Sequence, residues 1–116
     1  MQQSDNGRLL SNKNKKSRET HRVLIHPRVL SKRPWIGERQ LITTWRRAFR
    51  LAPRQGNHEP PQTMAVGWDD EGRLMEMLSF ADGDTQVIFH AAPARKKFLL
   101  EIGFNEQTIR DFIGGR

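Results

Sequence analysis

Residues 64–98 of this chain are MAVGWDDEGRLMEMLSFADGDTQVIFHAAPARKKF, and this stretch decides the fold. It contains three runs rich in apolar and β-branched residues, 64–68, 73–80 and 85–91, which predict three strands. The two segments between them, DDEG and ADGD, are short, polar and glycine-containing, as hairpin turns are. Consecutive strands joined by tight turns pair in antiparallel order, so the stretch predicts the centre of an antiparallel sheet.

Helical patterns lie on both sides of this stretch. Upstream, residues 36–52 carry apolar side chains at three- and four-residue steps, as one helix face requires: Leu41, Ile42, Trp45, Ala48, Phe49 and Ala52. Downstream, Pro93 is placed to start a helix, and Asn105 to cap a final short one. A β-rich run at 22–26, RVLIH, precedes all of these and predicts one more strand.

The predicted order of elements is β-α-β-β-β-α-α, which indicates an α+β fold with a small antiparallel sheet and helices on one face. We expect residues 21–116 to form this single domain. Residues 1–20 have only Leu9 and Leu10 as sizeable apolar groups, too little to offset the entropy of ordering, so we expect a disordered basic arm. Residues 53–63, which include three prolines, predict a polar loop.

Composition excludes several classes of protein. The chain has no cysteine, so neither disulfides nor thiolate metal sites can form, and this favours a cytoplasmic location. No apolar run approaches the roughly 18 residues that a membrane span needs. The four histidines are scattered without the spacing of metal ligands, so no metal or other cofactor is predicted.

The charge is divided unevenly along the chain. Residues 1–58 hold 14 lysines and arginines against three acids, whereas residues 59–116 hold six against ten. The first part therefore has a net charge of +11 and the second of −4, which together give the +7 of the whole chain. A strongly basic half attracts polyanions, and RNA is the partner that we expect; a solubilising tail on an ordinary surface is the alternative.

Polar residues interrupt the predicted strands. Glu76 shares a strand face with leucines, where a carboxylate needs a partner. Regular alternation places Ile88 and His90 on one face of the neighbouring strand, and this makes His90 the candidate partner of Glu76. The pair is either a hydrogen bond that only stabilises the sheet or part of a catalytic site.

Cleavage of RNA by attack of the 2′-hydroxyl needs a base, an acid, and cations that stabilise the charged phosphorane. His90 can serve as base or acid, Glu76 can orient it, and Arg73 can stabilise phosphate, so these three are the candidate catalytic residues. Solvated helix surface is the alternative for several of the basic residues that we expect to bind nucleic acid. The candidate binding residues are His26, Lys32, Arg33, Arg39, Arg46, Arg50, Arg95, Lys96 and Lys97.

Two segments, AVGWDDEGRLMEMLSF and VIFHAAPARKKF, resemble the C-terminal half of BrnT-type toxins. There, a strand, a turn with Gly-Arg and a second strand precede a strand that ends in a small, basic, helix-starting motif. HPRVLSKRPWIGERQLITTWRRAF resembles the first part of that family, which belongs to the RelE-like superfamily of toxin ribonucleases. The resemblance covers residues 21–103. It points to His26, Lys32, Arg33, Arg73, Arg95, Lys96 and Lys97.

We therefore expect a RelE/BrnT-like, metal-independent endoribonuclease of a bacterial toxin–antitoxin pair. It would bind and cleave RNA through a basic face and be neutralised by an antitoxin protein. Two other functions stay open: a non-catalytic nucleic-acid-binding regulator, and a protein-interaction domain whose charge is incidental. Cleavage separates the first function from the second, and salt-dependent binding of nucleic acid separates both from the third. A homo-oligomer also stays open.

Overall fold

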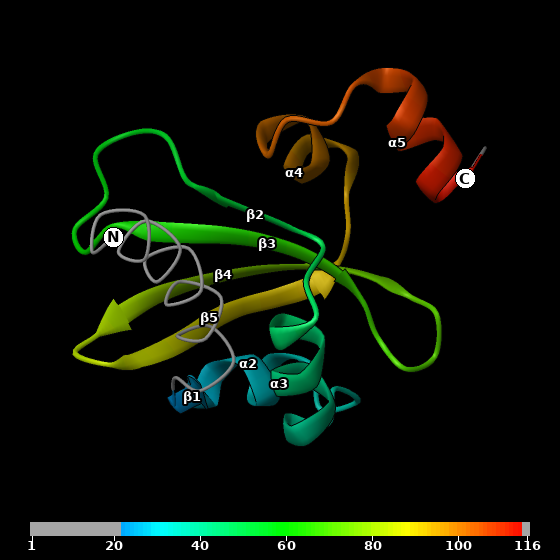
Figure 1. Cartoon of the computed structure of the whole chain (residues 1–116). Coiled ribbons are helices and arrows are strands. Elements are labelled where there is room, and N and C mark those ends of the chain that lie inside the picture. The colour runs from blue at the N-terminus through cyan, green and yellow to red at the C-terminus, as the bar shows by residue number, and fades with distance from the viewer. Residues whose placement is uncertain (1–21, 115–116) are drawn as a thin grey trace, which may run out of the picture.

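The computed structural model of the chain describes residues 22–114, which build a five-stranded sheet with helices packed on it (Figure 1). The predicted arm at 1–20 lies outside the described residues. No helix in the described part is long and apolar enough to cross a membrane. In chain order the elements are β1 (Arg22–Ile25), α2 (Pro27–Lys32), α3 (Glu38–Arg46), β2 (Arg50–Pro53), β3 (Gln62–Trp68), β4 (Leu74–Asp82), β5 (Thr85–Pro93), α4 (Lys96–Glu101) and α5 (Glu106–Ile113).

The sheet has the strand order β1-β5-β4-β3-β2. The three strands predicted from residues 64–98 are confirmed as its antiparallel centre, and β2 adds antiparallel to β3. β1 pairs parallel with β5, so the prediction of a wholly antiparallel sheet is wrong. Strands joined by a hairpin have to run antiparallel. No hairpin joins β1 to β5, because most of the domain lies between them along the chain, so these two strands can pair in parallel.

Helices pack on both faces of the sheet, not on one as predicted. α2 and α3 cover the face that carries Met75 and Met77, whereas α4 and α5 cover the face that carries Leu74 and Leu78 (Figure 1). The middle strand β4 is apolar on both faces, and each face has to be buried. The two halves of the core therefore lie on opposite sides of β4.

The predicted helix at 36–52 is shorter than its apolar period. α3 begins after Gly37 and ends at Arg46, and the following residues pair as the edge strand β2. The N–H of Phe49 donates to the carbonyl of Val66, 3.0 Å away, so hydrogen bonds to β3 replace those of a helix. Tertiary pairing thus overrides a local helical pattern.

Helix α2 was not predicted. His26 caps it, because its Nδ1 accepts a hydrogen bond of 3.2 Å from the N–H of Arg28, and Pro27 occupies the first helical position. The cap of the last helix is confirmed: Oδ1 of Asn105 accepts from the N–H of Thr108 at 2.8 Å. Both caps use a side chain that satisfies one of the unpaired donors at a helix start.

Candidate functional site

A buried carboxylate on β4 organises the candidate site. The side chain of Glu76 is 0 % exposed and lies on the sheet face that α4 and α5 cover. Its Oε2 accepts hydrogen bonds from Nε2 of His90 at 2.8 Å and from Nη2 of Arg95 at 2.7 Å. Its Oε1 accepts from the backbone N–H of Arg95 at 2.9 Å. The predicted contact between Glu76 and His90 is therefore confirmed, and Arg95 completes the cluster.

These donors keep Glu76 ionised. Burial by itself raises the pKa of this carboxyl, but the hydrogen bonds from His90 and Arg95 outweigh it and hold the pKa below its ordinary value of 4.5. The hydrogen bond between the side chains of Arg95 and Glu76 raises the pKa of the Arg95 guanidinium. An ionised carboxylate only accepts hydrogen bonds, so Nε2 of His90 carries a proton. The neutral imidazole then has its free lone pair on Nδ1, which bonds to no residue within 22–114.

A bulge in β5 brings His90 to the face of Glu76. Ile88 pairs with Ser79 and His90 pairs with Leu78, which leaves Phe89 as the extra residue. Ile88 packs under α2 and α3, whereas His90 points to the opposite face. The expectation that Ile88 and His90 share a face is therefore wrong, although the contact inferred from it exists.

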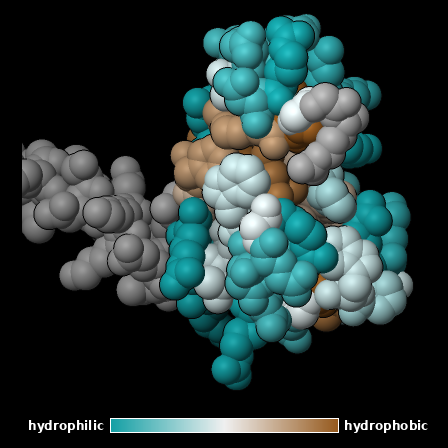
Figure 2. All heavy atoms as spheres, turned by 90° about the vertical axis from the view of Figure 1, so that its right-hand side faces the viewer, coloured by the Kyte–Doolittle hydropathy of each residue, from teal (hydrophilic) through white to brown (hydrophobic). Residues whose placement is uncertain are grey.

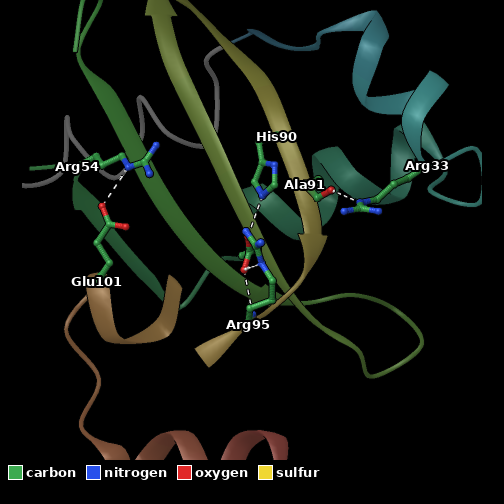
Figure 3. Close-up of polar contacts among 7 residues, drawn as sticks. Arg33, Arg54, His90, Ala91, Arg95 and Glu101 are labelled. Atoms are coloured by element: carbon green, nitrogen blue, oxygen red, sulfur yellow. Dashed lines mark hydrogen bonds and ion pairs between the residues drawn. The ribbon is translucent and has the colours of Figure 1, made fainter. Parts of the chain in front are cut away.

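The far edge of β5 borders a basic groove. β1 pairs with β5 only as far as Ile88, and beyond it α2 lies beside the strand. Nε of Arg33 donates to the carbonyl of Ala91 at 2.9 Å, while His90 and Arg95 converge on the buried acid (Figure 3). The groove has a volume of about 490 Å³ and no acidic residue in its lining: Arg28, Val29, Ser31, Lys32, Arg33, Phe89, His90 and Ala91.

Comparison with protein-family models, with curated proteins and with solved structures gives no match for this chain. The resemblance to BrnT-type toxins therefore stays a hypothesis that rests on the three segments quoted above.

The chemistry of the groove follows from the residues that line it. The imidazole of His90 is held by the buried carboxylate of Glu76. It borders a cavity whose charged lining residues, Arg28, Lys32 and Arg33, are all positive. Within residues 22–114, no three carboxylate or imidazole side chains come together as metal ligands.

The structure does not bring Arg73 to this cluster. Nε of Arg73 donates to Oδ2 of Asp69 at 2.7 Å, and its guanidinium lies 4.5 Å from the ring centre of Trp35, on the side of the sheet that faces α3. Hydrogen bonding to Asp69 raises the pKa of Arg73. Burial by itself raises the pKa of Asp69. The hydrogen bonds that Asp69 accepts from Arg73 and from the N–H of Glu71 outweigh burial, so the pKa of Asp69 lies below its ordinary value. Three acids, Asp69, Asp70 and Glu71, line the hollow beside Arg73, so phosphate would meet repulsion there.

The predicted binding residues are distributed over several places. Lys32 and Arg33 border the groove, and Arg95 lies in the cluster around Glu76. His26 is used as the cap of α2. Nζ of Lys96 pairs with Oε1 of Glu106 at 3.2 Å. Lys97 is exposed in the first turn of α4.

Three of the predicted binding residues, Arg39, Arg46 and Arg50, fall within the helix predicted at 36–52, but they do not lie on one helix. Arg39 and Arg46 lie on α3, but Arg50 lies on β2. Its guanidinium is 4.0 Å from the ring centre of Phe104, and Nη1 donates to the carbonyl of Ile102 at 3.3 Å. Arg50 is separated from Arg39 and Arg46 because the chain leaves α3 at Arg46 and enters the sheet.

Two groove residues were missed from the sequence, Arg28 and Ser31. Both lie on α2, and with Lys32 they follow the three- and four-residue steps of one helix face. The available signal was His26-Pro27, a cap followed by proline at the first helical position. Taken as a helix start, it predicts α2 and places these side chains together.

Proposed function

We propose that this chain is a metal-independent endoribonuclease that binds RNA in the groove between α2 and β5 and uses His90 as its general base. One observation carries the proposal: His90, fixed by the buried and ionised Glu76, borders a cavity with three cationic side chains and no acid. Such a cavity attracts phosphate, and the imidazole beside it is a side chain that can serve as a general base.

The proposed step exchanges one phosphorus–oxygen bond, and proton transfers to His90, from water and back to solvent balance it. Nδ1 of His90 accepts the proton of a ribose 2′-hydroxyl while the 2′-oxygen attacks the adjacent phosphorus. The bond from phosphorus to the 5′-oxygen breaks, and that oxygen takes a proton from water. The products are a 2′,3′-cyclic phosphate and a 5′-hydroxyl, and the imidazolium returns its proton to solvent.

The surrounding residues have distinct roles in this proposal. Glu76 fixes the ring, because its hydrogen bond to Nε2 selects the tautomer with a basic Nδ1. Lys32 and Arg28 supply positive charge to the phosphate from the turn of α2 opposite the strand. Arg33 contributes charge while its Nε remains bound to the carbonyl of Ala91. Arg95, 66 % exposed and paired with Glu76, extends the basic surface beyond the groove.

The resemblance to BrnT-type toxins extends the proposal to a biological setting. We propose a RelE/BrnT-like fold and an antitoxin that covers the basic groove in the resting cell. An antitoxin with acidic side chains at the groove would complement the charge of Lys32 and Arg33. Growth arrest on expression of the chain, relieved by a protein encoded beside it, is the expected behaviour.

The test is cleavage of single-stranded RNA by the purified full chain, read as 2′,3′-cyclic phosphate ends. We expect His90→Gln to lower the rate at least about 100-fold, the usual contribution of a general base. RNA with deoxyribose at the cleaved position should stay intact, because it lacks the attacking hydroxyl. His58→Gln is the matched control: His58 lies outside the groove, where its Nε2 contacts the carbonyl of Gln55 at 2.9 Å.

Equal cleavage by the wild type and by His90→Gln would remove His90 from the reaction. The absence of cleavage on both free and ribosome-bound RNA, with salt-dependent binding retained, would support a non-catalytic nucleic-acid-binding regulator instead. The basic lining of the groove favours this second function independently of His90. Circular dichroism of each variant shows whether the fold is intact.

A further inference from the structure

Two aromatic rings on the surface lie beside each other at the end of β3. Phe49 and Trp68 are each 45 % exposed, and their ring centres are 6.3 Å apart at an angle of 20° between the ring planes. Hydrophobic surface gathers in a band between hydrophilic regions on this side of the molecule (Figure 2). Exposure of two large aromatic side chains in one place is unfavourable in water and is typical of a surface that contacts a partner.

The two rings are held in place from below. Phe112 of α5 packs edge-on against both, at 5.8 Å from the ring of Phe49 and 6.0 Å from that of Trp68. Phe104 packs against Phe49 at 6.1 Å and against Phe112 at 5.2 Å. Because aromatic pairs of this geometry attract, the exposed rings are pre-oriented before any partner arrives.

The charge around the rings selects the kind of partner. Residues 38–54 contain five arginines and one acid, a net charge of +4. Arg39 and Arg47 line a hollow of about 190 Å³ together with Trp68. Asp69 and Asp70 also line it. Asp69 is ion-paired with Arg73, whereas Asp70 adds a negative charge, so phosphates would bind on the side of the hollow formed by the two arginines. Aromatic faces flanked by arginines match the bases and phosphates of a single nucleic-acid strand.

We propose that Phe49 and Trp68 form a stacking platform for the unpaired bases of single-stranded RNA, with Arg39 and Arg47 on its phosphates. Trp68 and His90 point to the same sheet face, since Trp68 pairs with Leu74 and His90 with Leu78. Four residues along the strands and two strand spacings separate them, about 16 Å between Cα atoms. One RNA strand is long enough to reach both, provided that it passes around α4 and α5, which cover this face. The inference rests on the proposed function for the choice of RNA.

The test measures binding of a single-stranded deoxyoligonucleotide, which resists cleavage, to the full chain by fluorescence anisotropy. We expect Trp68→Ala to weaken binding about 5- to 100-fold, the effect of one lost base–aromatic stack. The dependence of affinity on salt should be unchanged, because no phosphate contact is removed. An abasic oligonucleotide of the same length should bind wild type and Trp68→Ala equally.

Trp35→Ala is the matched control. Trp35 is 47 % exposed, nearly as much as Trp68, but its ring centre lies 4.5 Å from the guanidinium of Arg73, and Glu71 lines its hollow in addition to Asp69 and Asp70. Its replacement should leave binding unchanged. Trp68→Phe should restore most of the affinity, because it keeps an aromatic face, whereas Trp68→Leu keeps the apolar contact with Phe112 and should not. The pair of variants separates stacking from a loss of folding.

Equal affinities for Trp68→Ala and Trp35→Ala variants would overturn the platform. In that case, if Trp68→Ala abolishes self-association in size-exclusion chromatography, the rings form an interface between two copies. Binding that depends on Trp68 without any RNA cleavage would overturn the endonuclease and keep the platform. Cleavage that is unaffected by Trp68→Ala would overturn the platform and keep the endonuclease. A wild type that binds no oligonucleotide at low salt would overturn both.

Discussion

At the scale of single residues, Glu76 decides the character of the site. A buried carboxylate without partners would be protonated or would destabilise the fold. Here His90 and Arg95 donate to it, and its pKa falls below 4.5 despite burial. The ionised form then fixes the tautomer of His90, which links the stability of the sheet to the chemistry proposed for the groove.

Glu76→Gln should reduce the free energy of unfolding at pH 7 by about 1–3 kcal/mol, because charged hydrogen bonds are lost. The pKa of Glu76 is lower in the folded than in the unfolded chain, so its stabilising effect is complete above pH 4.5 and disappears as the pH falls through the folded value. Denaturation by urea from pH 7 down to pH 3 should show the two proteins converging. A constant difference would contradict the lowered pKa.

Glu101→Gln is the control for this measurement. Glu101 pairs with Nε of Arg54 at 3.0 Å (Figure 3). Both side chains are 31 % exposed. Exposed ion pairs contribute about 0–1 kcal/mol, so this substitution should have a smaller effect at pH 7. A loss as large as that of Glu76→Gln would mean that burial does not distinguish the two acids.

At the scale of elements, the packing of α3 on β3 depends on a glycine. A Cβ atom on Gly67 would lie 3.0 Å from the carbonyl oxygen of Thr44 and 3.1 Å from the Cα of Ala48. Both are backbone atoms, which cannot rotate away as a side chain does. The helix backbone therefore lies directly on the strand, and this contact brings Phe49 to the edge where β2 begins.

Gly67→Ala should destabilise the fold by about 1–3 kcal/mol, the usual effect of overpacking in a tight contact. Thermal unfolding measures it, and the midpoint should fall relative to wild type. Thr63→Ala, at the other end of β3, should have a smaller effect because its side chain is only partly buried. An unchanged midpoint for Gly67→Ala would show that α3 can move away from the strand without loss of packing.

At the scale of the whole molecule, most of the lysines and arginines before residue 59 belong to the described domain. Residues 22–58 hold nine of the 14 lysines and arginines found before residue 59, against a single acid. The remaining five lie in residues 1–20, together with two acids. A polyanion would therefore meet positive charge on the folded domain itself as well as on the N-terminal segment.

Deletion of residues 1–20 should change the free energy of unfolding by less than about 1 kcal/mol, since this segment has little apolar surface to bury. Affinity for single-stranded RNA should still fall steeply between about 50 and 200 mM salt, because the charges of the domain remain. Loss of most of the salt dependence would place the phosphate contacts in the segment. A large loss of stability would show that the segment packs on the domain.

Much of this protein can be predicted from local sequence. The strands of residues 64–98 follow from apolar runs between glycine-containing turns, and Asn105 is read directly as a cap, because these signals involve neighbours in the chain. The contact between Glu76 and His90 was also within reach, since a carboxylate among leucines on a central strand needs a partner.

Tertiary structure alone decided the rest, because the deciding contacts join residues far apart in the chain. The apolar period at 36–52 continues past Arg46, yet hydrogen bonds to β3 end the helix there. The bulge at Phe89 follows from the register of β5 on β4, which local pattern does not specify, and it turns His90 to the face of Glu76. The basic groove likewise exists only because β1 stops at Ile25 and α2 continues along the open edge of β5.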